Sequence, residues 1–167
     1  MVKKKSKGRE NTDLDPRFHW VAVTAIIVKD GKFLISKRAD WEKAFPNMWT
    51  VPGGKMRFGQ YPMGRTQKGH PQQYDVVDWV LRNEVKEETS VEIEKPQYLC
   101  DLVFVGPTGI PVLTLSYWAK WKKGKVKLAD ESLVDYAWVS LAEAKKYDLI
   151  DGIYDELVMV AKILRKK

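Results

Sequence analysis

Apolar residues follow a strand pattern through much of the chain. The run 21–27 consists of β-branched and small apolar residues with one threonine, which predicts a buried strand. Asp30-Gly31 is a turn sequence and 32–37 returns as a second strand, so the two strands should form a hairpin. Further strands are predicted over 97–105, 112–121 and 134–139.

Other segments follow a helical period. A helix is predicted over 75–89, with Asp75 as its N-cap. A short helix over 141–147 follows, and a terminal helix begins near Ile153 with Asp151 as its cap. The apolar face of the first helix comprises Val77, Val80, Leu81 and Val85. Strands mixed with a few helices predict an α/β or α+β sandwich.

The polar segments divide the chain into a tail and one domain. Residues 1–17 are polar and basic and are expected to be a disordered tail, with a single domain over 18–167. Within the domain, 39–48 is expected to be a loop, and Pro52-Gly53-Gly54 to break regular structure. The Gly- and Pro-rich segment 55–74 predicts a long loop, which inside a compact domain is usually functional or mobile.

The composition limits which kinds of site and which cellular location can be expected. The net charge is +7, but the first nine residues carry five cations and leave +2 for the remainder. The single cysteine, Cys100, excludes an internal disulfide and a cysteine zinc site, and we expect it to be an inert thiol in the core. No apolar run predicts a membrane span or a signal peptide, so a cytoplasmic location is expected.

Three carboxylates share one arc of the predicted helix. At about 100° per residue, Glu84, Glu87 and Glu88 point in the direction that the apolar stripe takes one or two turns earlier. Crowded, dehydrated carboxylates repel one another, and a hard divalent cation such as Mg²⁺ or Mn²⁺ removes that penalty. An ordinary solvent-exposed acidic face is the alternative. The upstream Gly53-Gly54 turn favours the metal, because a bared carbonyl there can complete an ion's shell.

These residues resemble the signature box of the Nudix hydrolases, the MutT-type pyrophosphohydrolases. The box pattern is Gly, five residues, Glu, seven residues, Arg-Glu, an aliphatic, any residue, Glu-Glu, any residue, Gly, an aliphatic. The matching segments are Gly54 with Gln60, and Glu84-Val85-Lys86-Glu87-Glu88-Thr89-Ser90-Val91. The lead-in 49–55 and the later segment 138–143 also resemble the family. The resemblance covers roughly residues 18 to 165.

The sequence departs from the box in four ways. Gln60 replaces the first glutamate, Asn83 the arginine and Ser90 the last glycine. Gln60 and Asn83 are separated by 22 residues, which is an insertion of 15. We expect a neutral amide contact between Gln60 and Asn83 in place of a charged one, and Ser90 to adopt a backbone that glycine takes more easily.

The resemblance implies an α/β/α sandwich with a mixed sheet, and Mg²⁺- or Mn²⁺-dependent hydrolysis of a nucleoside diphosphate linked to another moiety. The implied metal ligands are Glu84, Glu87, Glu88 and the Gly53 carbonyl. The general base is either a box glutamate, such as Glu84 or Glu87, or the later acid Glu131. The residues that we expect to contact substrate are Arg38, Lys55, Trp41, Phe45, Arg65 and Lys68.

A second hypothesis is a Nudix-fold module that binds a nucleotide or RNA without hydrolysis. The altered positions Gln60, Asn83 and Ser90 and the basic tail favour it. The intact glutamate set favours the enzyme, which we prefer. The substrate would be a nucleoside triphosphate, ADP-ribose or a nucleotide sugar, and the protein a monomer or homodimer.

Overall fold

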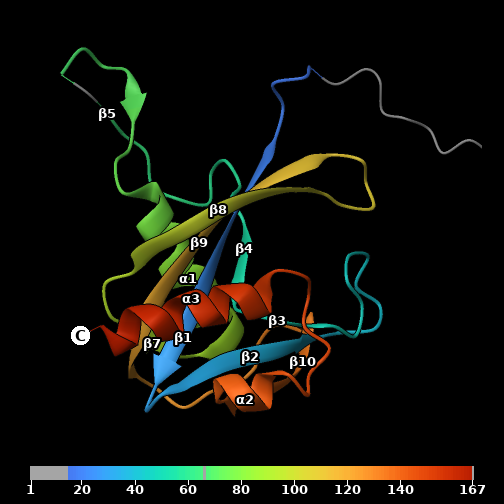
Figure 1. Ribbon diagram of the computed structural model, residues 1–167. Helices are drawn as coiled ribbons and strands as arrows, with labels where there is room; N and C mark the ends of the chain where they lie inside the picture. The colour runs from blue at the N-terminus through green and yellow to red at the C-terminus, as the bar shows by residue number, and fades with distance from the viewer. Residues whose placement is uncertain (1–14, 66, 167) are drawn as a thin grey trace, which may run out of the picture.

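The structure, a computed structural model, describes residues 15–65 and 67–166, so most of the predicted tail lies outside the described residues. Figure 1 shows a twisted sheet with helices on both of its faces. The strands are β1 (Trp20–Lys29), β2 (Lys32–Arg38), β3 (Trp49–Thr50), β4 (Gly53–Lys55), β5 (Gly64–Arg65), β6 (Pro71–Gln72), β7 (Glu92–Ile93), β8 (Gln97–Val105), β9 (Pro111–Lys123) and β10 (Leu133–Val139). The helices are α1 (Val76–Thr89), α2 (Leu141–Ala144) and α3 (Ile153–Arg165).

The sheet is mixed. Its path runs β10-β2-β1-β9-β7, with β3 pairing on β2, β4 on β1 and β8 on β9. The long central pair β1 and β9 is parallel, whereas the other pairs within the sheet are antiparallel. The predicted mixed-sheet sandwich is therefore confirmed.

The central strand β1 supplies apolar side chains to both layers. Because side chains alternate along a strand, Val23, Ala25 and Ile27 pack on the α1 side while Ile26 and Val28 pack on the α3 side. Helix α1 covers its side with Val80, Leu81 and Val85, and α3 covers the other with Ile153, Leu157 and Val160. The strand reads as almost continuously apolar because both of its faces are covered.

Several predicted boundaries need correction. The Pro52-Gly53-Gly54 segment does not end regular structure, because Gly53–Lys55 forms β4 and pairs with β1. Segment 55–74 is not entirely loop, since it contains the antiparallel pair β5 and β6. Figure 1 shows the segment around β5 extending away from the sheet. The helix predicted over 141–147 ends at Ala144.

The helix ends differ from prediction for local reasons. Asp75 stands at the N-cap of α1, but its φ of 56° is left-handed and its side chain makes no capping hydrogen bond. Gly152, not Asp151, is the N-cap of α3. Ser90 does take the left-handed conformation expected of it, with φ 61°, and its amide donates to the Lys86 carbonyl. No helix among the described residues is long and apolar enough to cross a membrane.

A buried acid lies where β1, β9 and α3 meet. Glu156 of α3 is only 4% exposed, and its Oε1 accepts a hydrogen bond from the Ser116 hydroxyl at 3.2 Å. Its other oxygen, Oε2, has no hydrogen-bond partner among the described residues. Burial raises the pKa of Glu156 above its ordinary 4.5, and the Ser116 hydrogen bond opposes this.

Replacing Glu156 with Gln should therefore stabilise the fold near neutral pH. A raised folded-state pKa means that the folded protein holds the proton more tightly than the unfolded chain. The stability cost is absent below the unfolded pKa and grows as pH rises through the folded pKa. We expect Glu156→Gln to add about 1 kcal/mol at pH 7, or about 3 °C in Tm, and much less at pH 4. Thermal unfolding at the two pH values measures this, with exposed Asp155→Asn as the control. An equal gain at both pH values would contradict it.

Candidate active site

The site is built where helix α1 meets the glycine turn of β4. The Gly53 amide donates to Glu88 Oε2 at 2.9 Å, which joins the last turns of α1 to the strand. A Cβ at Gly53 would collide with the Val23 carbonyl oxygen, and a Cβ at Gly54 would collide with the Glu84 carboxylate. Gly53 is therefore required for the close approach of β4 to β1, and a side chain at position 54 would displace the Glu84 carboxylate.

The Gly53 carbonyl points away from β1. The Ala25 amide donates to the Pro52 carbonyl, and the Met56 amide donates to the Val21 carbonyl. Hydrogen-bonded pairs alternate along an antiparallel ladder, so Gly53, opposite Thr24, falls in a pair without ladder bonds. Its amide and carbonyl therefore face outward on the same edge, and the amide already contacts Glu88. The Gly53 carbonyl therefore faces the same side as the amide that contacts Glu88.

Gln60 contacts a glutamate rather than Asn83. Its side-chain amide donates to Glu84 Oε1 at 2.5 Å, and its oxygen accepts from the Arg57 amide at 3.1 Å. The predicted Gln60–Asn83 pairing is therefore wrong. An amide at position 60 fits here because an ionised glutamate would repel Glu84, whereas the amide donates to it.

The electrostatics of the two inner carboxyls are unusual. The pKa of Glu88 is raised to about 8, mainly by burial and also by the charges of Glu84 and Asp130, although the hydrogen bond from the Gly53 amide opposes the shift. Burial also raises the pKa of Glu84, the Gln60 hydrogen bond opposes, and Glu87 and Asp130 add to the rise. Negative charge at this turn is therefore disfavoured unless a cation neutralises it.

The remaining predicted acids are more exposed. Glu87 lies on the solvent side of α1, and Glu131 is exposed in the turn before β10. Sequence reasoning missed the preceding residue, Asp130, whose charge acts on both Glu84 and Glu88. Among the described residues, no three His, Cys, Asp or Glu side chains stand together as a ready metal site.

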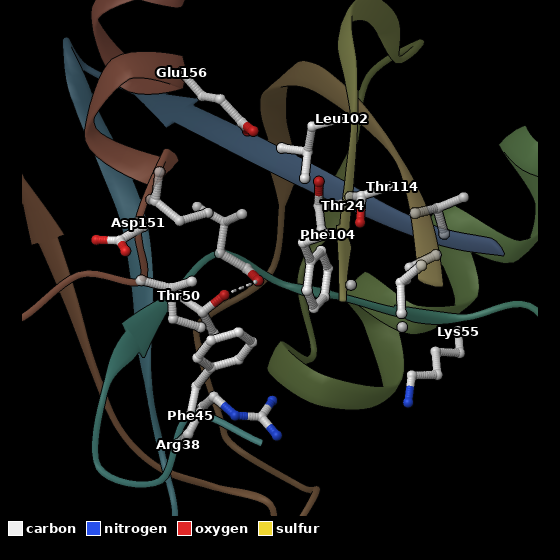
Figure 2. Close-up of a pocket in the computed structure, with 18 of the residues that line it drawn as sticks. Thr24, Arg38, Phe45, Thr50, Lys55, Leu102, Phe104, Thr114, Asp151 and Glu156 are labelled. Carbon is white, nitrogen blue, oxygen red and sulfur yellow. Dashed lines mark hydrogen bonds between the residues drawn. The ribbon is translucent and has the colours of Figure 1, made fainter. Parts of the chain in front are cut away.

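A cavity of about 390 Å³ opens beside the turn. It lies between β1, β8, β9 and the start of α3, and Figure 2 shows its lining. Residues lining it include Thr24, Arg38, Phe45, Gly53, Gly54, Lys55, Glu88, Leu102, Phe104, Thr114, Asp151 and Glu156. Its volume lies in the range of small-molecule sites.

Three of the predicted substrate residues line this cavity. Arg38 donates to Glu42 Oε2 at 2.6 Å and to the Ala44 carbonyl at 2.9 Å, which holds the 39–48 loop. Phe45 from that loop packs on Phe104 of β8, with ring centroids 5.8 Å apart. The Lys55 ammonium lies 4.0 Å from the centre of the Trp20 ring. Burial lowers the pKa of Lys55, and the charges of Arg38 and Arg57 lower it further.

The other three predicted substrate residues are not brought to the cavity. Trp41 is 65% exposed, and Arg65 and Lys68 are exposed around the β5–β6 pair. Conversely, the pattern of the sequence did not single out Leu102, Phe104 or Glu156 as site residues. The signals that could have found them are the alternation of residues along β8 and the single acidic position in the apolar stripe of α3. Cys100, expected in the core, is half-buried, and burial raises its pKa.

Comparison with known proteins agrees with this geometry. The family model described as NUDIX domain matches residues 18–158. A search of curated proteins returned no match. A MutT NUDIX hydrolase from Burkholderia pseudomallei superposes with a TM-score of 0.67 at 20% identity, covering 86% of this chain and 99% of that one.

Two further structures carry ADP-ribose in their descriptions. The NUDIX domain of Shewanella oneidensis NrtR complexed with ADP ribose has a TM-score of 0.69 at 18% identity, covering 92% of this chain and 95% of that one. An ADP-ribose pyrophosphatase from Streptococcus suis has a TM-score of 0.63 at 17% identity, covering 89% and 93%. Nudix hydrolases act on pyrophosphate bonds and generally use a divalent metal ion. The matched family model and the shared fold together place the chain in the Nudix family.

Proposed function

We propose that this protein is a Mg²⁺- or Mn²⁺-dependent pyrophosphohydrolase that cleaves a nucleoside diphosphate linked to another moiety. The observation that carries the proposal is the pair of desolvated carboxyls, Glu84 and Glu88, held against a glycine turn that lines the cavity. Two partly buried carboxyl groups with raised pKa values are costly for a purely structural helix. The cavity beside these carboxyl groups suggests that they serve substrate binding and hydrolysis.

The donor set fits a hard divalent cation. Glu84, Glu87, Glu88 and the Gly53 carbonyl would hold it, and all of these ligands are oxygens, which favours Mg²⁺ or Mn²⁺ over zinc. Burial and the charges of neighbouring carboxylates raise the pKa values of Glu84 and Glu88. A bound cation would offset both effects. When bound, the ion supplies a Lewis acid for the diphosphate and lowers the pKa of a water molecule.

The cavity cations are arranged for phosphate. Arg38 is fixed by Glu42 and the Ala44 carbonyl, so its guanidinium is preorganised. Lys55 follows the glycine turn directly, and its position over Trp20 sets the direction of the side chain. Both residues line the cavity together with Glu88. They would neutralise phosphate oxygens on the side away from the acidic helix.

The late turn before β10 supplies an additional acid. Asp130 accepts a hydrogen bond from the Ser132 amide at 2.7 Å, which fixes its carboxylate. Its charge reaches Glu84 and Glu88 across the site. We assign it the role of accepting a proton from the attacking water, in place of the predicted Glu131.

The direct experiment is a hydrolysis screen with Mg²⁺ and with Mn²⁺. Nucleoside triphosphates, ADP-ribose, nucleotide sugars and dinucleoside polyphosphates are incubated with folded protein, and the products are separated by chromatography. We expect a nucleoside monophosphate from at least one of them, and none in excess EDTA. Tight nucleotide binding without any product would instead support the non-catalytic module.

Removing one inner carboxylate should abolish most activity. Glu84→Gln and Glu88→Gln each keep the shape of the side chain but remove a charge from the metal site. We expect kcat/KM to fall by about 100-fold or more, because several kcal/mol of charge stabilisation is lost. The kcat/KM of Glu87→Gln should fall by a similar factor. Glu94→Gln, at an exposed position, is the matched control. Near-wild-type rates for the three variants would refute the ligand assignment.

Asp130 and Glu131 are distinguished by paired substitutions. Asp130→Asn should lower kcat by about 100-fold with little change in KM, because general-base catalysis contributes on this scale. Glu131→Gln should leave kcat unchanged, since among the described residues the charge that acts on Glu84 and Glu88 from this turn is that of Asp130. Steady-state kinetics of the two variants check the assignment, because loss of the base lowers kcat while KM is little changed. The opposite ranking of the two variants would restore Glu131 as the base.

A further inference from the structure

The cavity has a carboxyl group that the hydrolytic chemistry does not use. Glu156 lines it from α3, whereas Arg38 and Lys55 line it from β2 and β4. Figure 2 shows the Glu156 side chain directed from α3 toward Leu102, on the opposite side of the pocket from Arg38. This carboxyl is only 4% exposed, and its Oε2 finds no partner within the part of the chain that the structure describes, so it is a buried polar group whose hydrogen bonding is incomplete.

The neighbouring hydroxyls fix which atoms donate. The Ser116 hydroxyl donates to Glu156 Oε1 at 3.2 Å, and Thr24 Oγ1 lies 3.0 Å from Ser116 Oγ. Because a serine has one hydroxyl proton, Thr24 must be the donor to Ser116. Both protons therefore run toward the carboxyl group, whose Oε1 is the acceptor at the end of this chain. Within residues 15–65 and 67–166, no ion pair of Glu156 with Lys, Arg or His is found.

The surroundings of the free oxygen indicate what would bind it. Leu102 and Phe104 of β8 and Phe45 form an apolar and aromatic wall of the same cavity. Such a wall suits a flat heterocycle, and the carboxylate requires N–H donors at the edge of that heterocycle. The phosphate-binding cations Arg38 and Lys55 lie in the same cavity, so the heterocycle would be the base of a nucleotide.

The common bases differ at the edge that a carboxylate reads. Guanine presents two adjacent donors, the ring N1–H and the exocyclic amino group. Adenine and cytosine present one donor beside a ring nitrogen acceptor, whose lone pair repels a carboxylate oxygen. Uracil presents one N–H between two carbonyl acceptors. Only guanine among them offers two donors side by side to two carboxylate oxygens.

We propose that Glu156 is a specificity-determining residue that selects guanine nucleotides by accepting hydrogen bonds from the base. The proposal rests on the proposed function, because it places the base in the cavity that the diphosphate site shares. It goes further in naming the substrate class and a residue outside the hydrolytic machinery. In the free protein, burial of Oε2 without a hydrogen bond costs free energy, and a hydrogen bond donated by the base would offset that cost.

Binding of nucleoside monophosphates tests the proposal without requiring hydrolysis. Calorimetric titration of GMP, IMP and AMP in EDTA compares bases that differ in their donors. We expect the affinity for GMP to exceed that for AMP by about 10-fold or more, because GMP donates hydrogen bonds to the carboxylate that AMP cannot donate. IMP lacks the amino group and should fall between the two.

The decisive variant is Glu156→Gln. Its amide presents one acceptor and one donor, which complements adenine instead of guanine. We expect the affinity for GMP to drop about 10-fold or more while the affinity for AMP holds or rises. Asp155→Asn removes a charge from the exposed side of the same helix and should leave both affinities unchanged. A merely structural role for Glu156 would move both affinities together.

The outcomes separate this proposal from the hydrolase assignment. Equal binding of the three nucleotides, no binding of any of them, or an unchanged GMP preference in Glu156→Gln would overturn guanine selection. Metal-dependent hydrolysis of adenine or uracil compounds alongside such a result would leave the hydrolase assignment standing. Guanine-selective binding with no turnover in the hydrolysis screen would do the reverse.

Discussion

The hydrogen bond from the Gly53 amide to Glu88 is the contact on which the site depends. It fastens the C-terminal half of α1 to β4, and β4 is itself paired with the central strand β1. The absence of a Cβ at Gly53 lets β4 lie against the backbone of β1, and the absence of one at Gly54 leaves room for the Glu84 carboxyl group. The same packing that encloses the carboxyl groups raises their pKa, so the geometry that stores charge repulsion at the turn also creates the need for a cation.

The two ends of the cavity use buried acids in different ways. At the turn, Glu88 is held by the Gly53 amide beside Glu84, and cations from β2 and β4 line the adjoining wall of the cavity. At α3 a single acid is held by one hydroxyl and keeps one oxygen without a partner. The first arrangement suits charge neutralisation, and the second suits the recognition of a neutral donor edge. A protein that stores unfavourable burial at both ends trades stability for binding.

The local hydrophobic pattern predicted the helices and the long strands well. A strand buried on both faces is a continuous apolar run, and an amphipathic helix has apolar residues at a helical period. The spacing of Glu84 and Glu88 after the glycine pair likewise indicated that the end of α1 and the glycine turn would lie together, as they do. What failed depended on contacts between distant segments. Asp130 and Glu131 are indistinguishable as sequence, and only the backbone of the turn decides which one faces α1. Glu156 sits in an otherwise apolar stripe, and its role depends on the pairing of β8 with β9, which periodicity does not specify.

The anchoring of the segment between Gln60 and α1 has an evolutionary consequence. Gln60 is tied to Glu84 by its side-chain amide, and the other end of the segment enters the helix at Asp75. Both ends are thus clamped to the same scaffold, and the entropy of closing such an excursion grows only slowly with its length, by about 0.6 kcal/mol for each doubling. Lineages can therefore lengthen, shorten or recompose this excursion without displacing the helix, which makes it a natural place for new contacts to be acquired.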